Sequence, residues 1–116
     1  MINWQPNNIS VIYERADLLS KIREFFKQEN VIEVDTPLLC SYAGTAVHID
    51  PFIFQDPKDN LKFLQTSPEY AMKRLLASGS SDIFQICKAF RANEIGKLHN
   101  PEFTMFLWYL GVAPCT

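Results

Sequence analysis

Hydrophobic residues recur at helical spacing in the first third of the chain, at Ile12, Ala16, Leu19, Ile22 and Phe26. Side chains three or four residues apart lie on one face of a helix, and Ser10 is placed to cap its start. The repeat stops near Asn30, and residues 31–34 then alternate as a strand does. The pattern predicts a helix followed by a strand, which Pro37 ends or confines to a sheet edge.

The middle of the chain carries shorter alternating stretches. Residues 47–54 predict a strand interrupted by Pro51, and residues 61–65 predict another strand. Between them, residues 56–60 have the Asp, Pro and Asn composition of a surface turn. This order predicts a chain that returns on itself.

A second helix is predicted to begin at the sequence Ser67-Pro68-Glu69. The Ser67 hydroxyl can cap the helix, Pro68 suits its first position, and Glu69 places negative charge near its N-terminus. The helix is expected to end by Gly79. Its inward-facing residues are expected to be Met72, Leu75 and Leu76.

The last predicted unit is similar to a β-hairpin. Residues 83–90 alternate through an apolar run that Arg91 ends, and the chain returns through residues 103–109 after a polar loop. Arginine is a planar, always charged fork that suits a phosphate or a carboxylate, so the mouth of this hairpin predicts an anion site. Together the elements predict an α+β fold, built as an antiparallel sheet flanked by helices.

Composition narrows the class of protein. The chain has 116 residues, 47% of them hydrophobic, enough for one domain over residues 1–116 with a real core. No apolar run approaches the roughly 18 residues of a membrane helix, and the start lacks a signal-peptide pattern. The net charge of −2 argues against a tRNA-sized basic surface. Cys40, Cys87 and Cys115 form no CxxC pair, which indicates reduced thiols of a cytoplasmic protein without a disulfide or a metal site.

Three segments resemble a known family. Residues 90–105 contain Phe-Arg, a polar loop and His-Asn-Pro-Glu-Phe-Thr-Met, similar to motif 2 (about 83–109 here) of the class II aminoacyl-tRNA synthetases in its lysine-specific form. The Ser-Pro-Glu-Tyr sequence within residues 66–76 is most similar to that of the elongation factor P β-lysine ligases, free-standing relatives of lysyl-tRNA synthetase. The helix, strand and proline of residues 12–38 resemble motif 1, through which members of the family form homodimers.

The resemblance implies ATP-dependent activation of lysine or β-lysine as an aminoacyl-adenylate and its transfer to a lysine of elongation factor P. Arg91 would be the catalytic guanidinium that, with Mg²⁺, stabilises negative charge on the α-phosphate. ATP would be bound by Arg91, Ala92, Asn93, Asn100 and Phe103, with Phe103 stacking on adenine. The amino acid would be bound by Ser67, Pro68, Glu69 and Tyr109, with Glu69 meeting its amino group.

Each feature also has a plainer structural explanation. Residues 67–69 make a well-formed helix start, Arg91 could pair with a surface acid at little gain in stability, and residues 12–38 could be an ordinary amphipathic helix on its own sheet. The neighbouring motifs favour the functional interpretation for Glu69 and Arg91. His99 suits a phosphate contact and neutral packing equally.

Several positions depart from the family pattern. Asn93 stands where motif 2 has a glutamate, Leu107 where an acid precedes Trp108, and Leu110 where an arginine follows Tyr109. Residues 110–116 match nothing in the family, and its third, arginine-bearing motif is absent. These departures suggest a shifted reading frame or a truncated gene, and we expect the isolated chain not to be a competent ligase.

The start of the chain bears on which lysine-activating relative it resembles. The motif 1 helix begins about ten residues after Met1, which leaves no room for the anticodon-binding domain of lysyl-tRNA synthetase. We therefore expect elongation factor P rather than tRNA as the acceptor. The alternatives are a bare lysyl-tRNA synthetase core that charges tRNA, and a non-catalytic fragment that only dimerises or binds a partner.

Overall fold

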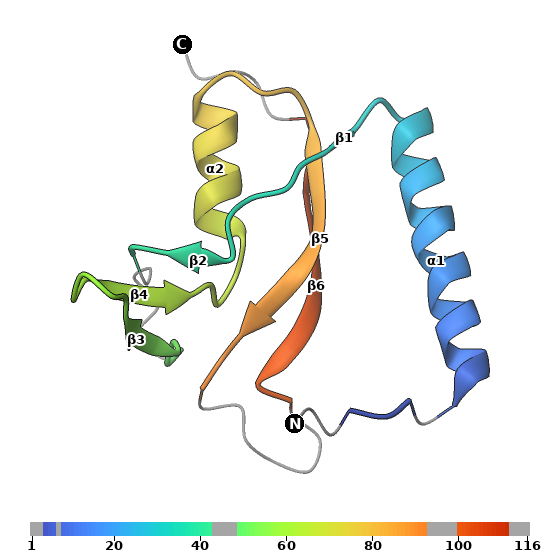
Figure 1. Cartoon of the computed structure of the whole chain (residues 1–116). Helices are drawn as coiled ribbons and strands as arrows, with labels where there is room; N and C mark the ends of the chain where they lie inside the picture. The colour runs from blue at the N-terminus through green and yellow to red at the C-terminus, as the bar shows by residue number, and fades with distance from the viewer. Residues whose placement is uncertain (1–3, 7, 43–48, 93–99, 112–116) are drawn as a thin grey trace.

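A computed structural model describes residues 4–6, 8–42, 49–92 and 100–111 of the chain. Figure 1 shows the arrangement of its elements: a hairpin of two long strands lies between two helices, and a smaller sheet lies beside one end of it. In chain order the elements of the described residues are α1 (Ile9–Gln28), β1 (Ile32–Glu33), β2 (Leu39–Cys40), β3 (Ile53–Gln55), β4 (Leu61–Leu64), α2 (Glu69–Ala77), β5 (Ile83–Phe90) and β6 (Glu102–Tyr109).

The first sheet has the strand order β1-β5-β6. Strands β5 and β6 pair antiparallel over their full lengths, with Ile83 opposite Tyr109 at one end and Phe90 opposite Glu102 at the other. The predicted hairpin is therefore confirmed, and β6 begins one residue earlier than expected. Strand β1 pairs with β5 in parallel, which the sequence pattern did not predict.

The hairpin has two different faces, because directly opposed residues project to the same side of a sheet and successive residues to opposite sides. One face carries Phe84 and its partner Trp108 together with Ile86 and its partner Phe106. The other face carries, from one end to the other, Ile83 with Tyr109, Gln85 with Leu107, Cys87 with Met105, and Ala89 with Phe103. Helices α1 and α2 lie on opposite sides of the hairpin (Figure 1).

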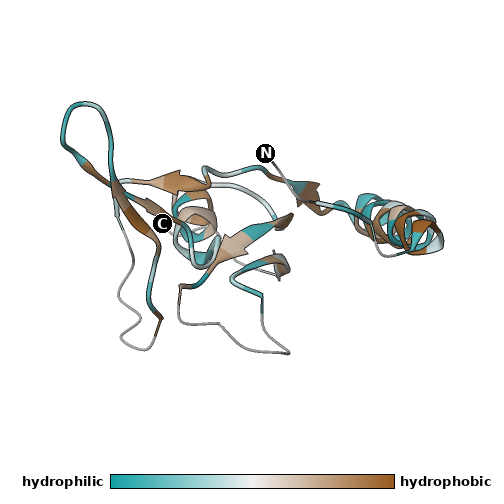
Figure 2. Ribbon diagram, turned by 60° about the horizontal axis from the view of Figure 1, so that its bottom comes forward, coloured by the Kyte–Doolittle hydropathy of each residue, from teal (hydrophilic) through white to brown (hydrophobic). Residues whose placement is uncertain are grey.

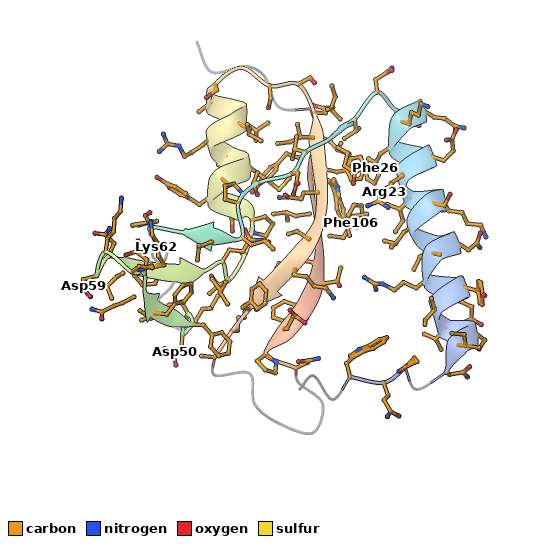
Figure 3. The ribbon with its side chains drawn as sticks, in the orientation of Figure 1. Arg23, Phe26, Asp50, Asp59, Lys62 and Phe106 are labelled. Atoms are coloured by element: carbon orange, nitrogen blue, oxygen red, sulfur yellow. The ribbon has the colours of Figure 1, made fainter. Side chains whose placement is uncertain are left out.

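The aromatic core lies between α1 and the first face of the hairpin. Phe26 is 6% exposed and its ring stacks on Phe84, with 4.7 Å between centroids. Its edge meets Phe106 at 5.4 Å, and both side chains are seen between helix and sheet in Figure 3. Val31 closes the cluster just after the helix. In the C-terminal half of the predicted apolar stripe, Phe26 is therefore buried and Ile22 is half-buried.

The N-terminal half of α1 differs from the prediction. Ile12 is 44% exposed, and Ala16 is exposed as well. The cap is Asn8, whose side-chain oxygen accepts the Ser10 backbone N–H at 3.0 Å and the Ser10 hydroxyl at 2.8 Å. The prediction of Ser10 as the cap is wrong because Asn8, two residues earlier, directs its side-chain oxygen at the free Ser10 amide of the first turn.

The second sheet has the strand order β2-β4-β3 and is antiparallel throughout. The predicted turn joins β3 to β4: Asp56 accepts the backbone N–H groups of Lys58 and Asn60 at 2.8 and 2.9 Å, and Asp59 takes a positive φ of 63°. The predicted strand over residues 47–54 is wrong in extent. Strand β3 begins after Pro51, which has no N–H to give to a ladder, and residues 47 and 48 lie outside the described residues.

Two buried glutamines connect the two sheets. The Gln85 side-chain oxygen accepts the Thr36 backbone N–H at 2.7 Å, and its amide donates to the Thr36 hydroxyl at 2.9 Å. Thr36 belongs to the segment between β1 and β2. The Gln65 amide donates to the Lys88 carbonyl of β5 at 2.8 Å, and the Gln65 carbonyl accepts the Phe90 N–H. Both side chains satisfy buried polar groups that would otherwise be unpaired.

Helix α2 leads from the second sheet into β5. Pro68 occupies the N-cap position and the first helical residue is Glu69, so the prediction that Pro68 is the first helical residue is wrong by one position. The C-terminus ends in a Schellman motif: the Ser80 N–H donates to the Leu75 carbonyl and the Gly79 N–H to the Leu76 carbonyl. Gly79 has a φ of +99°, a conformation that other residues adopt at a cost.

The α+β class is confirmed, with one correction to the architecture. Instead of one antiparallel sheet, the described residues form two three-stranded sheets, and the first includes a parallel pair. No helix in the described part of the chain is long and apolar enough to cross a membrane.

Candidate functional site

Arg91 stands immediately after β5, at the mouth of the hairpin. Its Nε donates to the Thr66 carbonyl at 3.3 Å, and its guanidinium carbon lies 5.2 Å from the centre of the Phe103 ring. Its backbone N–H donates to the Pro101 carbonyl at 2.9 Å. The contacts come from two segments, the one before α2 and the start of β6, and the contacts with Thr66 and Phe103 set the direction of the guanidinium before any ligand binds.

The turn that precedes α2 is next to this arginine, because Thr66 directly precedes Ser67. The Ser67 hydroxyl accepts the Glu69 backbone N–H at 3.2 Å, but it does so from the position before the N-cap, which is Pro68. The prediction of Ser67 as the N-cap is therefore wrong by one position. Pro68 is fully buried, and its carbonyl accepts the Met72 N–H at 3.0 Å. The buried proline and the capping hydroxyl hold the backbone of Glu69, whose side chain is exposed.

Glu69, Lys73 and Tyr109 form one electrostatic group. The Lys73 ammonium lies 2.7 Å from the Glu69 carboxylate, and this hydrogen bond, followed by the charge of Glu69, raises the pKa of Lys73. Tyr109, from the far end of β6, is half-buried. Its burial raises the pKa of its phenol; the Glu69 charge adds to this rise and the Lys73 charge opposes it.

The predicted nucleotide residues differ in availability. Phe103 is half-buried on the same hairpin face as Tyr109, with Arg91 above its ring. The Ala92 backbone N–H already donates to the Asp50 carbonyl at 2.8 Å. Asn100 is exposed and its side-chain oxygen accepts the Glu102 N–H at 3.2 Å, so this oxygen shapes the turn. Asn93 and His99 lie outside the described residues.

The predicted residues fall into two groups, one toward each end of the hairpin. Arg91 and Phe103 meet at the mouth of the hairpin, Thr66 links them to the turn at 67–69, and Tyr109 shares the electrostatic environment of Glu69. An arginine beside an acid-bearing turn can bind a ligand with an anionic end and a cationic end.

Leu107 lies on this same face, directly opposite Gln85 and between Met105 and Tyr109 along β6. It is half-buried. A hydrophobic side chain therefore stands on the site face at the position where the family pattern has an acid.

Two contributors were missed by the sequence reasoning. The Thr66 carbonyl is a backbone group, and no residue type marks it. Lys73 had a signal, because an acid followed four residues later by a lysine forms a pair on a helix. What the sequence lacked was the position of Tyr109, which comes from a strand 36 residues further along.

A shallow hollow of about 430 Å³ lies elsewhere, between the end of α1 and the first sheet. None of the predicted site residues lines it. Its lining residues are Arg23, Lys27, Asn30, Val31, Ile32, Glu33 and Phe84.

Helix α1, an acid-bearing turn and an arginine at the mouth of an antiparallel hairpin fit a class II synthetase fold. The chain belongs to the family of class II tRNA synthetases (D, K and N), whose family model matches residues 3–115.

Within that class the chain is similar to proteins named elongation factor P–(R)-β-lysine ligase. It is 50% identical over 114 residues to that of Haemophilus ducreyi, 48% over 115 residues to that of Edwardsiella ictaluri, and 50% over 112 residues to that of Pseudoalteromonas translucida. The alignments cover 93%, 94% and 91% of this chain, which spans 35% of the length of each relative.

Proposed function

We propose that this chain supplies the ATP- and amino-acid-binding part of a ligase that activates a lysine-type amino acid and transfers it to elongation factor P. The observation that carries the proposal is the hydrogen bond from Arg91 to the Thr66 carbonyl, which holds a guanidinium beside the turn that bears Glu69. The names of the relatives supply the acceptor and the substrate.

The proposed reaction has two steps. In the first, the carboxylate oxygen of the amino acid attacks the α-phosphorus of ATP, a mixed anhydride forms, and pyrophosphate leaves. Arg91 faces the negative charge that gathers on the α-phosphate oxygens. In the second, the amine of a lysine on elongation factor P attacks the acyl carbon, loses a proton, and AMP leaves.

The amino acid and the adenine of ATP would be bound by different residues. Glu69 would bind the α- or β-ammonium group, since its carboxylate already bonds one ammonium at 2.7 Å. Phe103 would offer adenine the ring face that Arg91 does not cover. Tyr109 would line the pocket of the amino acid from the site face of the hairpin.

Mg²⁺ is proposed to come with ATP rather than from a site of the protein alone. The described part of the chain gathers no three His, Cys, Asp or Glu side chains into a metal-binding group. Mg²⁺ in nucleotide sites is commonly held by substrate phosphates and one or two carboxylates, and the steps above are therefore assigned to this chain's own residues alone.

A cytoplasmic protein acceptor fits the charge of the chain. The net charge is −2, whereas proteins that hold a tRNA body present a basic surface. Elongation factor P is therefore preferred to tRNA as the acceptor, and the lysyl-tRNA synthetase core is the second candidate within the class.

A homodimer through residues 12–38 is also proposed, supported by the exposed apolar side chains of α1. Tyr13, Leu18 and Phe25 are 72%, 58% and 57% exposed, and the ribbon of α1 carries hydrophobic as well as hydrophilic residues along its turns (Figure 2). The same surface favours the alternative of a fragment that only dimerises. Self-association of the chain without nucleotide affinity would support that alternative.

The test is a chimera in which this chain replaces the matching third of the Haemophilus ducreyi ligase. We expect lysine- or β-lysine-dependent ATP–pyrophosphate exchange and labelling of elongation factor P. The Arg91→Ala chimera should lose about 10²–10³-fold in exchange rate, while Arg15→Ala, which removes another arginine hydrogen-bonded to the hairpin, should retain it. A folded chimera without exchange would overturn the proposal.

The isolated chain is the complementary test, and we expect no ATP–pyrophosphate exchange from it.

The position of Leu107 allows a more specific test of the site. In the chimera, Leu107→Glu should raise the exchange rate if the site face needs an acid there, whereas Leu110→Glu, three residues further along, should not. An equal response of the two variants would show that position 107 has no special part.

A further inference from the structure

Lys73 stands where the proposed function places the amino group of the substrate. Its Nζ is 2.7 Å from Oε1 of Glu69, the length of a charge-assisted hydrogen bond. The lysine side chain ends in a primary ammonium on a flexible stem, so it presents to Glu69 the same group that lysine or β-lysine would present.

The pair differs from an ordinary pair on a helix surface. Lys21 and Asp17 have the same spacing on α1 and are 2.8 Å apart, with 74% and 64% of their side chains exposed. Lys73 and Glu69 are less exposed, at 59% and 55%. Both charges also reach Tyr109 on a different element, where Glu69 raises and Lys73 lowers the pKa of the phenol, and Ser67 accepts the backbone N–H of the acid.

We propose that Lys73 is an internal competitor for the ammonium site, so that the amino acid binds by exchanging its ammonium for that of Lys73 on the Glu69 carboxylate. This inference rests on the proposed function of Glu69. In the free protein the carboxylate is thus already neutralised, and the flexible stem of Lys73 lets its ammonium move to water when the substrate arrives.

Two consequences distinguish a competitor from a residue that only supports α2. Removal of a competitor strengthens substrate binding, since the carboxylate no longer has to give up a partner. Exchange also conserves the number of ion pairs, so the affinity of the unaltered chain should depend little on salt through this contact. Without Lys73, binding creates a new pair and should weaken as salt rises.

The experiment is an NMR titration of the full 116-residue chain with L-lysine and, separately, with (R)-β-lysine, at low and at high salt. Lys73→Met should bind either amino acid about two- to fivefold more tightly, the range expected for an exposed ion pair, and its affinity should be the more salt-dependent. Lys21→Met is the matched control and should bind as the unaltered chain does. Amide spectra of both variants establish that they fold.

Glu69→Gln separates the competitor role of Lys73 from the proposed role of Glu69 in binding the substrate. Binding that Glu69→Gln weakens but that Lys73→Met leaves unchanged or weakens would overturn the competitor role and leave the role of Glu69 intact. Binding that does not depend on Glu69, or no binding by any variant, would overturn both. In the supporting outcome, the signals of the Lys73 ε-methylene move on titration toward those of an unpaired lysine.

Discussion

The two sheets of this protein are built with very different amounts of burial. The β1-β5-β6 sheet packs Phe84 and Ile83 at 2% and 1% exposure, and Phe26 stacks on it. In the β2-β4-β3 sheet, Ile53 and Leu61 are 56% and 53% exposed, and its rim carries polar residues such as Asp59 and Lys62 (Figure 3). Because local stability follows buried contacts, the site is supported on one side by a packed hairpin and on the other by a loosely packed sheet.

The largest expected effect tests the packed hairpin. Phe84→Ala removes a ring that is 2% exposed and stacked at 4.7 Å on Phe26, and should lower the free energy of unfolding by about 3–5 kcal/mol. Urea unfolding followed by circular dichroism measures it. Phe25→Ala is the control, since Phe25 is 57% exposed and should cost far less. Equal losses would contradict the assignment of the core.

The next effect tests the connection between the sheets. Gln85→Leu leaves the Thr36 N–H and hydroxyl without their partner at 2.7 and 2.9 Å, a buried loss of about 1–3 kcal/mol. Hydrogen exchange should then accelerate in the second sheet more than in β5 and β6. Gln28→Leu, on the exposed end of α1, should change neither. Uniform acceleration would mean that the two sheets open as one unit.

A smaller effect is expected at the joint between α2 and β5. Gly79 has a φ of +99° and open space around its Cα, so Gly79→Ala adds strain in the backbone rather than a clash. The expected loss is about 1–2 kcal/mol, measured by thermal unfolding. Ser78→Ala, at the preceding cap position with an ordinary φ of −85°, serves as the reference. A neutral Gly79→Ala would indicate that the Schellman turn relaxes.

The smallest effect is expected on the surface of the second sheet. Ile53→Thr exchanges a side chain that is 56% exposed for another that suits a strand, and should change the free energy of unfolding by less than about 0.5 kcal/mol. Chemical denaturation would detect a larger change. A loss near that of Phe84→Ala would mean that this face is buried in solution, and the comparison of the two sheets would fail.

The same comparison explains which features the sequence could predict. Strand β5 was predicted with its observed bounds, and the turn at residues 56–60 was predicted from its Asp and Asn, because these signals are local. The parallel pairing of β1 with β5 was not predicted, because periodicity shows that a strand exists but not with which strand it pairs. The prediction named Ser10 as the cap where the structure has Asn8, because both residue types cap helices and only the backbone conformation decides between them.

The candidate site also has features that the sequence could predict and features that it could not. The sequence motifs indicated Arg91, Glu69, Phe103 and Tyr109. In the structure Arg91 contacts Phe103 at one end of the hairpin, and Tyr109 lies at the other end on the same face. The availability of their groups was not in the sequence: the Ala92 N–H and the Asn100 oxygen already have partners. The proposed role of Lys73 was not in the sequence either. Its partner Glu69 is four residues away, but Tyr109 comes from a distant strand.

The pairing of β5 with β6 also determines which segments of the protein can tolerate inserted or deleted residues. The ends of the connecting segment are joined by the Arg91 N–H and the Pro101 carbonyl at 2.9 Å, and doubling such a segment costs only about 0.6 kcal/mol in closure entropy. Deletion of one codon between Phe103 and Tyr109 in β6 would instead put these two residues on opposite faces of the strand, so that one of them turns toward α1. Insertions and deletions that accumulate over generations should therefore fall between Arg91 and Pro101 and spare the strands β5 and β6.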